Sequence, residues 1–180
     1  MNVLRLYQNA YRSRPLIIHA VETGLIMASA DMVSQIIVEA RTFDSLDSGR
    51  ALRFGGIGLL VVAPARVGWY RFLEKKLPGC STSTVLQKLA LDQACFAPCL
   101  VLAIVSSVSY TSGMQTDQII DKLHSSFKDI MLNNWKVWPC VQLCNFYLVP
   151  AHLRMTTVQI VAFIWNIYLS WKANVNKSDL

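Results

Sequence analysis

An apolar stretch of 35 residues near the C-terminus, 137–171, most constrains how this chain can fold. Positions at alternating spacings of three and four carry polar side chains, interrupted only by Val149 and Phe163, and these side chains are Gln142, Asn145, His152, Thr156, Gln159, Asn166 and Ser170. That spacing places them along one face of a helix. A helix in water would carry charges on its polar face, whereas these side chains are amides, hydroxyls and a histidine. Because such groups suit bonding between helices or the lining of a water-filled lumen, the stretch predicts a membrane protein with a polar interior.

Three further apolar stretches of 23 residues are each long enough to cross a hydrocarbon core of about 30 Å: 16–38, 51–73 and 89–111. The C-terminal stretch is too long for one span, and Pro139 and Pro150 interrupt it. There we expect a kinked helix or a short interfacial segment that leads into a cleaner span at 155–171. Only 16% of the residues are charged, against about a quarter in soluble domains. We therefore predict one all-α domain over 1–180, a polytopic membrane helix bundle with about four transmembrane helices.

The connection between the third and fourth stretches has a helical pattern of its own. Its apolar residues recur at helical spacing, and they are Ile119, Ile120, Leu123, Phe127, Ile130 and Met131. Charged and other polar residues occupy the positions between them. This pattern predicts an amphipathic helix that lies at the membrane interface.

The net charge of +6 raises the question of a nucleic-acid partner. The lysines and arginines are scattered over loops and flanks instead of being gathered with aromatic residues on one surface, so we expect no direct nucleic-acid contact. They suit lipid headgroups. The first 15 residues contain three arginines and no acid, which resembles a mitochondrial targeting segment, and a basic patch flanking a membrane span explains them equally well.

Ionisable residues inside the apolar stretches point to function, because each is costly in hydrocarbon. They include Asp31, which shares a helix face with Gln35, and also Arg66 and Asp92. We expect Arg66 to pair with Asp31 or Asp92, leaving the other acid to face water or a cation. A purely structural role is open too, since the face of Asp31 also carries small residues suited to close helix packing.

Nothing in the sequence favours catalysis. No nucleophile-elbow, zinc-protease, phosphate-loop or dinucleotide signature occurs, so we expect no enzyme, no cofactor and no metal site. The pairs Cys95/Cys99 and Cys140/Cys144 have helical spacing in apolar segments, where cysteine acts as a small hydrophobic side chain. A redox-sensitive contact between the third and fourth spans is the alternative.

The C-terminal block reads W-x-x-W-P-x-x-Q-x-x-N-F-x-x-V-P-x-x-x-R and is closed by W-N-x-Y-L-S. It resembles the signature of the Mpv-seventeen / twenty-two-kilodalton peroxisomal membrane protein family, and is nearest to the branch that gives the family its name. Shorter pieces extend the resemblance over almost the whole chain: Pro15, Asp31 with Gln35, Pro64 with Trp69 and Tyr70, and Asp92 and Gln93 with Pro98. Val67 stands where many members have histidine, so any role of that histidine does not transfer.

The resemblance implies an integral protein of the mitochondrial inner membrane, with the peroxisomal membrane as the alternative. It also implies a weakly selective channel that moderates membrane potential, with links to mitochondrial DNA maintenance and reactive oxygen metabolism. The residues themselves leave two alternatives open. One is a carrier of metabolites such as nucleotides or their precursors, and the other is a non-conducting scaffold whose inward polar groups hold the helices together.

For the channel we assign three roles to the polar residues and prolines. Electrostatic control of the pathway falls to Asp31, Arg66 and Asp92, its lining to Gln35, Gln142, Asn145 and His152, and hinge motion to Pro64 and Pro150. The expected partners are the lipid bilayer and ions or small metabolites. Four helices alone enclose little lumen, which makes a homo-oligomer a further expectation.

Overall fold

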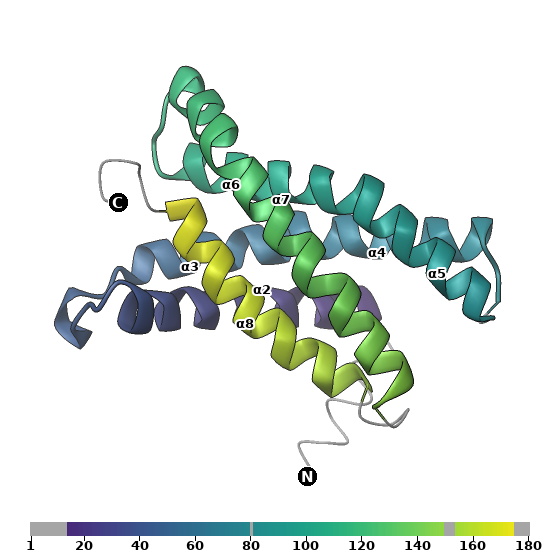
Figure 1. Cartoon of the computed structure of the whole chain (residues 1–180). Helices are drawn as coiled ribbons and strands as arrows, with labels where there is room; N and C mark the ends of the chain where they lie inside the picture. Colours follow the sequence, from purple (N-terminus) through teal and green to yellow (C-terminus); the bar gives the residue numbers. More distant parts are fainter. Residues whose placement is uncertain (1–13, 80, 150–153, 175–180) are drawn as a thin grey trace, which may run out of the picture.

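The computed structural model of the chain describes residues 14–79, 81–149 and 154–174, and its long elements are helices. The first three apolar stretches form three antiparallel helical rods that lie side by side (Figure 1). In chain order their segments are α2 (Pro15–Val33) with η1 (Ser34–Val38), α3 (Ser48–Ile57) with η3 (Gly58–Val62) and α4 (Ala63–Lys76), and α5 (Thr82–Leu91) with η4 (Asp92–Phe96) and α6 (Ala97–Thr111). A short 3-10 turn, η2 (Phe43–Ser45), lies in the loop after the first rod.

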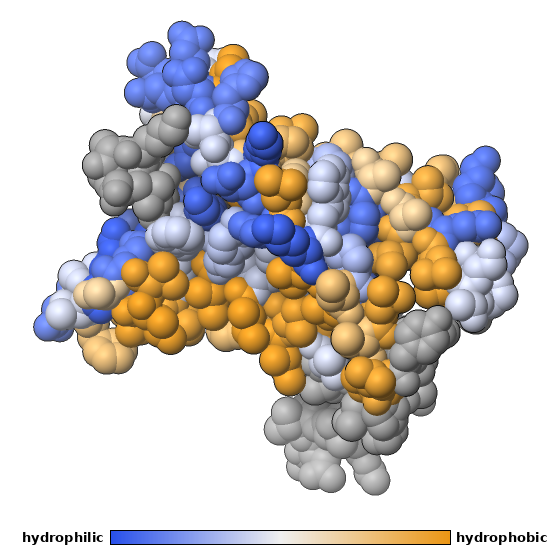
Figure 2. Space-filling view, viewed as in Figure 1, coloured by the Kyte–Doolittle hydropathy of each residue, from blue (hydrophilic) through white to orange (hydrophobic). Residues whose placement is uncertain are grey.

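All three rods are long and apolar enough to cross a membrane, which confirms the prediction of a helical membrane bundle. They cover Leu16–Val38, Ser48–Lys76 and Thr82–Thr111, with 23, 29 and 30 residues. The third begins earlier than expected because Ser81 caps α5, its hydroxyl accepting the Thr84 N–H at 3.2 Å. Apolar surface covers α2, and hydrophilic surface gathers at the ends of the molecule, both where α6 leads into α7 and where α4 meets α5 (Figure 2).

The expected fourth span, 137–171, is divided between two helices, α7 (Thr116–Tyr147) and α8 (Arg154–Asn174). They pack against each other and cross obliquely over the three rods (Figure 1). The amphipathic segment 119–131 is the first part of α7. The break expected at Pro139 does not occur, because a proline removes only one hydrogen bond and this 32-residue helix keeps the others. Pro150 lies outside the described residues.

The second and third rods share one internal construction. Each has a ten-residue α-helix, a five-residue π-helical turn and a second α-helix whose second residue is proline, Pro64 or Pro98, 34 positions apart. Because proline has no N–H, neighbouring hydrogen bonds shift by one residue. The N–H of Ala63 bonds to the carbonyl of Gly58, and that of Ala97 bonds to the carbonyl of Asp92. Both π-turns therefore interrupt their rods near the middle.

Small residues let the first two rods approach closely. A Cβ atom added to Gly55 would lie 2.9 Å from the Cβ of Ala28 and 2.9 Å from the carbonyl oxygen of Gly24. No ordinary side chain fits such a gap, so the face that carries Gly24 and Ala28 is a packing seam. Beyond Ala28, the next turn of α2 carries Asp31 into a buried polar site.

Candidate functional site

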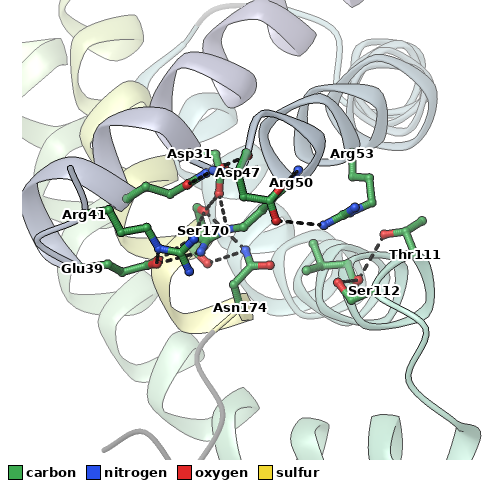
Figure 3. A network of polar contacts seen from close by, with 12 residues as sticks. Asp31, Glu39, Arg41, Asp47, Arg50, Arg53, Thr111, Ser112, Ser170 and Asn174 are labelled. Carbon is green, nitrogen blue, oxygen red and sulfur yellow. Dashed lines mark hydrogen bonds and ion pairs between the residues drawn. The ribbon is translucent and has the colours of Figure 1, made fainter. Parts of the chain in front are cut away.

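A buried ion-pair network joins the first rod to the second (Figure 3). Asp31 is 0% exposed and Arg50 is 7% exposed, so neither charge can rely on water. The Arg50 Nε donates to Asp31 Oδ1 at 2.9 Å. Its two Nη atoms donate to the two carboxylate oxygens of Glu39 at 2.9 and 2.6 Å, a bidentate arrangement that is among the strongest side-chain pairings.

Neighbouring groups complete the network. Arg41 Nε lies 3.0 Å from Glu39, so two arginines balance two carboxylates. The Ser170 hydroxyl, on α8, donates to Asp31 Oδ1 and accepts from Arg50 Nη2 at 3.3 Å. The network therefore ties α2, α3 and α8 together although these helices are far apart in sequence.

Gln35 fixes the loop that brings Arg50 to Asp31. Its amide nitrogen donates to Asp31 Oδ2 at 2.8 Å and to the carbonyl of Asp47 at 3.1 Å, and its amide oxygen accepts the Asp47 N–H at 2.8 Å. Asp47 in turn caps α3, its carboxylate accepting the Arg50 N–H at 2.8 Å. This chain of contacts orients the helix that carries Arg50.

This network differs from the expectation that Arg66 pairs with Asp31 or Asp92, because Asp31 pairs with another arginine. The partner is Arg50, which sequence reasoning treated as a loop cation. Two signals pointed to the real network. The spacing of four from Asp31 to Gln35 continues to Glu39, and only ten residues separate Glu39 from Arg50, which brings the ends of both rods together.

A second polar region lies in the middle of the bundle as a cavity of about 110 Å³. Residues from all three rods and from α7 and α8 line it. Its polar lining consists of His19, Thr23, Arg66, Tyr70, Asp92, Gln93, Asn134, Gln142, Gln159 and Asn166. Phe96, Trp138 and Trp165 contribute aromatic surface. The π-turn η4 supplies Asp92, Gln93 and Phe96, so a break in the helix lies at the cavity wall.

Neutral donors hold Asp92 in this cavity. Its Oδ1 accepts from Trp69 Nε1 at 3.1 Å, and its Oδ2 accepts from Gln93 Nε2 at 3.2 Å. Gln93 is anchored to α7, because its side-chain oxygen accepts from Asn134 at 2.8 Å and its carbonyl accepts from Trp135 Nε1 at 3.1 Å. That carbonyl is available because the Ala97 N–H bonds to Asp92 instead.

Three other polar groups of the cavity have no such anchors. Arg66 attracts Asp92 electrostatically, but within the described ranges it forms no ion pair shorter than 4.0 Å and no hydrogen bond. The amides of Gln142 and Gln159 also lack a hydrogen-bond partner among the described residues. The cavity thus offers a guanidinium and two amides that can bind water, an ion or a solute.

The network begins just beyond the cavity. On α2, Met27 lines the cavity and Asp31 follows one helical turn later. On α8, Leu169 lines the cavity and Ser170 is the next residue. The ion pairs therefore lie next to the cavity along both α2 and α8.

The predicted site residues fall into these two regions. Arg66, Asp92 and Gln142 meet at the cavity, whereas Asp31 and Gln35 belong to the network and do not line it. Pro64 lies at the start of α4, directly after a π-turn. Asn145 is in α7, but its side chain lies outside the described residues, as do His152 and Pro150.

In the described part of the chain, Cys95, Cys99, Cys140 and Cys144 are free and exposed. No group of three or more histidine, cysteine or acidic side chains in that part is placed to hold a metal ion.

Known proteins match this chain over almost its whole length. A model of the Mpv17 / PMP22 family matches residues 109–170. The mitochondrial inner membrane protein Mpv17 of Bos taurus is 40% identical over 97% of this chain and 99% of its own, and that of Homo sapiens is 38% identical over the same shares. The Drosophila melanogaster protein of the same name is 33% identical over 86% of this chain and 93% of its own. No solved structure matches the chain. With this identity over nearly the full length, and with helices fit to span a bilayer, the chain belongs to the Mpv17 / PMP22 family and is a protein of the mitochondrial inner membrane.

Proposed function

We propose that this protein is a weakly selective channel for ions or small solutes, and that its pathway passes through the central cavity. The observation that carries the proposal is a polar cavity lined by all three rods and by α7 and α8, inside a bundle with an apolar exterior. Polar and ionisable groups are costly inside a membrane, and they are typical of pathways for ions and water.

The ion-pair network supports a closed state of this pathway. Asp31 and Arg50 are buried, and Arg50 is bonded to both Asp31 and Glu39. These groups lie just beyond the cavity, so an ion cannot pass them without their separation. Opening would need a motion of α2, α3 and α8 relative to one another. The π-turns of the second and third rods are places where such a motion can bend a helix.

In this proposal conduction moderates the potential across the mitochondrial inner membrane. The links to mitochondrial DNA maintenance and to reactive oxygen metabolism rest on the family resemblance, and the cavity is compatible with a non-enzymatic role. The described helices of one subunit enclose only about 110 Å³, so in this proposal a homo-oligomer provides the wider pathway.

The test is planar-bilayer conductance of the purified, reconstituted protein beside two carboxylate variants. Asp92→Asn removes the one carboxylate that lines the cavity among the described residues, and Asp117→Asn removes an exposed carboxylate at the start of α7. We expect discrete current steps in the wild type. We also expect Asp92→Asn to shift the reversal potential in a salt gradient toward anion preference, whereas Asp117→Asn should leave it unchanged.

A lack of current steps from well-folded wild type, across voltage and redox conditions, would reject the channel. Equal reversal potentials for Asp92→Asn and the wild type would reject the pathway through this cavity. Each result leads to a different alternative, a protein without conduction or a pore elsewhere, such as one between subunits.

A metabolite carrier is the second candidate, and one observation favours it. The cavity is bounded by a charged network on one side and is flanked by helix interruptions near mid-rod, and transporters bind substrates at such interruptions. Saturable uptake into proteoliposomes without current steps would establish the carrier. Absence of both activities would leave the scaffold.

A further inference from the structure

We propose that the central cavity is a binding site for a small monovalent oxyanion, a carboxylate or a phosphate, held by the Arg66 guanidinium and the Gln142 and Gln159 amides. The inference rests on the cavity that the proposed pathway uses, but it concerns binding and requires no transport. It gives that pathway a ligand class.

Arg66 is the central element of the site. It is half-buried at the cavity wall, and no described carboxylate forms an ion pair with it. The nearest candidate, Asp92, directs its two oxygens at Trp69 and Gln93. A guanidinium inside a membrane bundle needs a partner, so water or an anion must supply the missing contacts.

Two amides extend the donor set beyond one cation. Gln142 comes from α7 and Gln159 from α8, and neither amide is used by another described residue. Other amides nearby are occupied, since Asn134 bonds to Gln93 and Asn166 bonds to the carbonyl of Ala162. The unoccupied donors therefore come from three different helices around one cavity.

The chemistry of these donors selects the ligand. A guanidinium presents parallel N–H groups that match the two oxygens of a carboxylate or phosphate, and amide N–H groups add further donors. Asp92 on the same wall disfavours a second negative charge by repulsion. A singly charged oxyanion satisfies both conditions.

Volume sets an upper limit on ligand size. The cavity has about 110 Å³, against roughly 30 Å³ for one water in the liquid and about 150 Å³ for an engineered cavity that binds benzene. Acetate or dihydrogen phosphate fits within it. A nucleoside monophosphate is too large for the cavity in this conformation.

Calorimetric titration in nanodiscs made only of phosphatidylcholine tests the proposal. The probes are acetate and inorganic phosphate, added to the wild type, to Arg66→Gln and to Arg71→Gln, which changes an exposed arginine that does not line the cavity. We expect saturable binding by the wild type and Arg71→Gln, with affinity at least tenfold lower in Arg66→Gln. Arg66→Lys keeps the positive charge but lacks the parallel N–H groups of the guanidinium, and should restore part of that affinity.

Equal affinity in Arg66→Gln and the wild type would overturn the site, as would a wild type that shows no saturable binding. The melting temperature of each variant checks its fold, and Arg66→Lys against Arg71→Lys replaces the comparison if Arg66→Gln does not fold. Tighter binding of a nucleoside monophosphate than of phosphate would overturn the size limit.

Two further measurements distinguish a soluble anion from a lipid headgroup, and anion binding from conduction. In nanodiscs that contain phosphatidylglycerol, unchanged affinity supports a soluble anion, and competitive loss assigns the site to a lipid headgroup instead. Binding without conductance would uphold this site and reject the channel, whereas conductance without Arg66-dependent binding would reject this site and leave the channel standing.

Discussion

Two polar regions inside one bundle differ in how completely their polar groups are bonded. In the ion-pair network, Asp31, Glu39 and Arg50 use nearly all of their hydrogen-bonding capacity on one another and on Gln35 and Ser170. In the central cavity, Arg66, Gln142 and Gln159 find no hydrogen-bond partner among the described residues. Both regions consist of costly polar side chains in an apolar surrounding, so composition alone does not separate them.

This difference in bonding distinguishes a region that stabilises the fold from a region that is available to bind a ligand. A buried charge that is paired and hydrogen-bonded fixes the geometry around it, because breaking any contact leaves the others uncompensated. A polar group without a protein partner loses free energy on folding unless a water molecule or ligand supplies the contact. The network therefore holds the helices in place, and the cavity is the region that can exchange its contents.

Removing the central arginine of the network should have the largest effect on stability. Arg50→Gln leaves Asp31 buried and uncompensated, and we expect a loss of about 3–5 kcal/mol. Arg66→Gln is the matched control in the cavity, where no ion pair is lost, and should change stability by less than about 1 kcal/mol. Thermal unfolding of the purified variants in one detergent gives the comparison.

The control also shows how this comparison could fail. If Arg66→Gln unfolds as early as Arg50→Gln, the cavity charge is as structural as the network, and the distinction between the two regions is lost. An unfolding temperature of Arg50→Gln equal to that of the wild type would also remove the distinction, because the network would then contribute no more to stability than the cavity does.

Moving the first two rods apart should break the network without touching its residues. Gly55→Ala places a Cβ 2.9 Å from the Cβ of Ala28 and from the carbonyl oxygen of Gly24, so α2 and α3 must separate. Overpacking of this kind costs about 1–3 kcal/mol. Gly68→Ala is the matched control, because a Cβ there meets nothing within 4 Å. If Gly55→Ala and Gly68→Ala have the same unfolding temperature, the seam does not position Asp31 and Arg50.

The sequence predicted the helical bundle because its signals were local. Length and apolarity placed the first three rods, and small residues spaced by four indicated the seam at Gly24 and Ala28. The division of 137–171 into α7 and α8 was harder to predict, because Pro139 carries a strong local signal for a break while a long helix tolerates the loss of one bond.

The partners of the charged residues could not be predicted as well. The sequence marked Asp31, Arg66 and Asp92 as costly, but which residues meet depends on how the rods pack. Arg50 stands in a region that reads as a polar loop, and it becomes buried because Gln35 and Asp47 draw that loop onto α2. The polar stripe of the C-terminal stretch was likewise divided, since Gln142 lines the cavity while Ser170 joins the network.

A smaller effect should follow from truncating the hydroxyl that links α8 to the network. In Ser170→Ala, Asp31 Oδ1 loses one of its two donors but keeps Arg50. A hydrogen bond to a charged group contributes about 1.5–3 kcal/mol, so we expect a loss near the lower end of this range. Thermal unfolding measures it, and a loss equal to that of Arg50→Gln would mean that the serine holds the network as firmly as the arginine does.

The smallest effect, and one of opposite sign, is expected where a buried hydroxyl is unsatisfied. Ser109 on α6 is 1% exposed, nearly as buried as Ser170, yet its Oγ has no hydrogen-bond partner in the described part of the chain. Ser109→Ala removes a desolvated polar group without breaking a contact, because the backbone carbonyl of Ser109 still accepts from Ser112 and Met114. We expect stability to stay the same or rise by up to about 1 kcal/mol.

Ser34→Ala repeats the test, since the Ser34 hydroxyl is also buried and has no hydrogen-bond partner in the described part of the chain. Clear destabilisation by both variants would show that these hydroxyls have acquired partners in the membrane-embedded protein, and burial with full bonding would then no longer set the network apart.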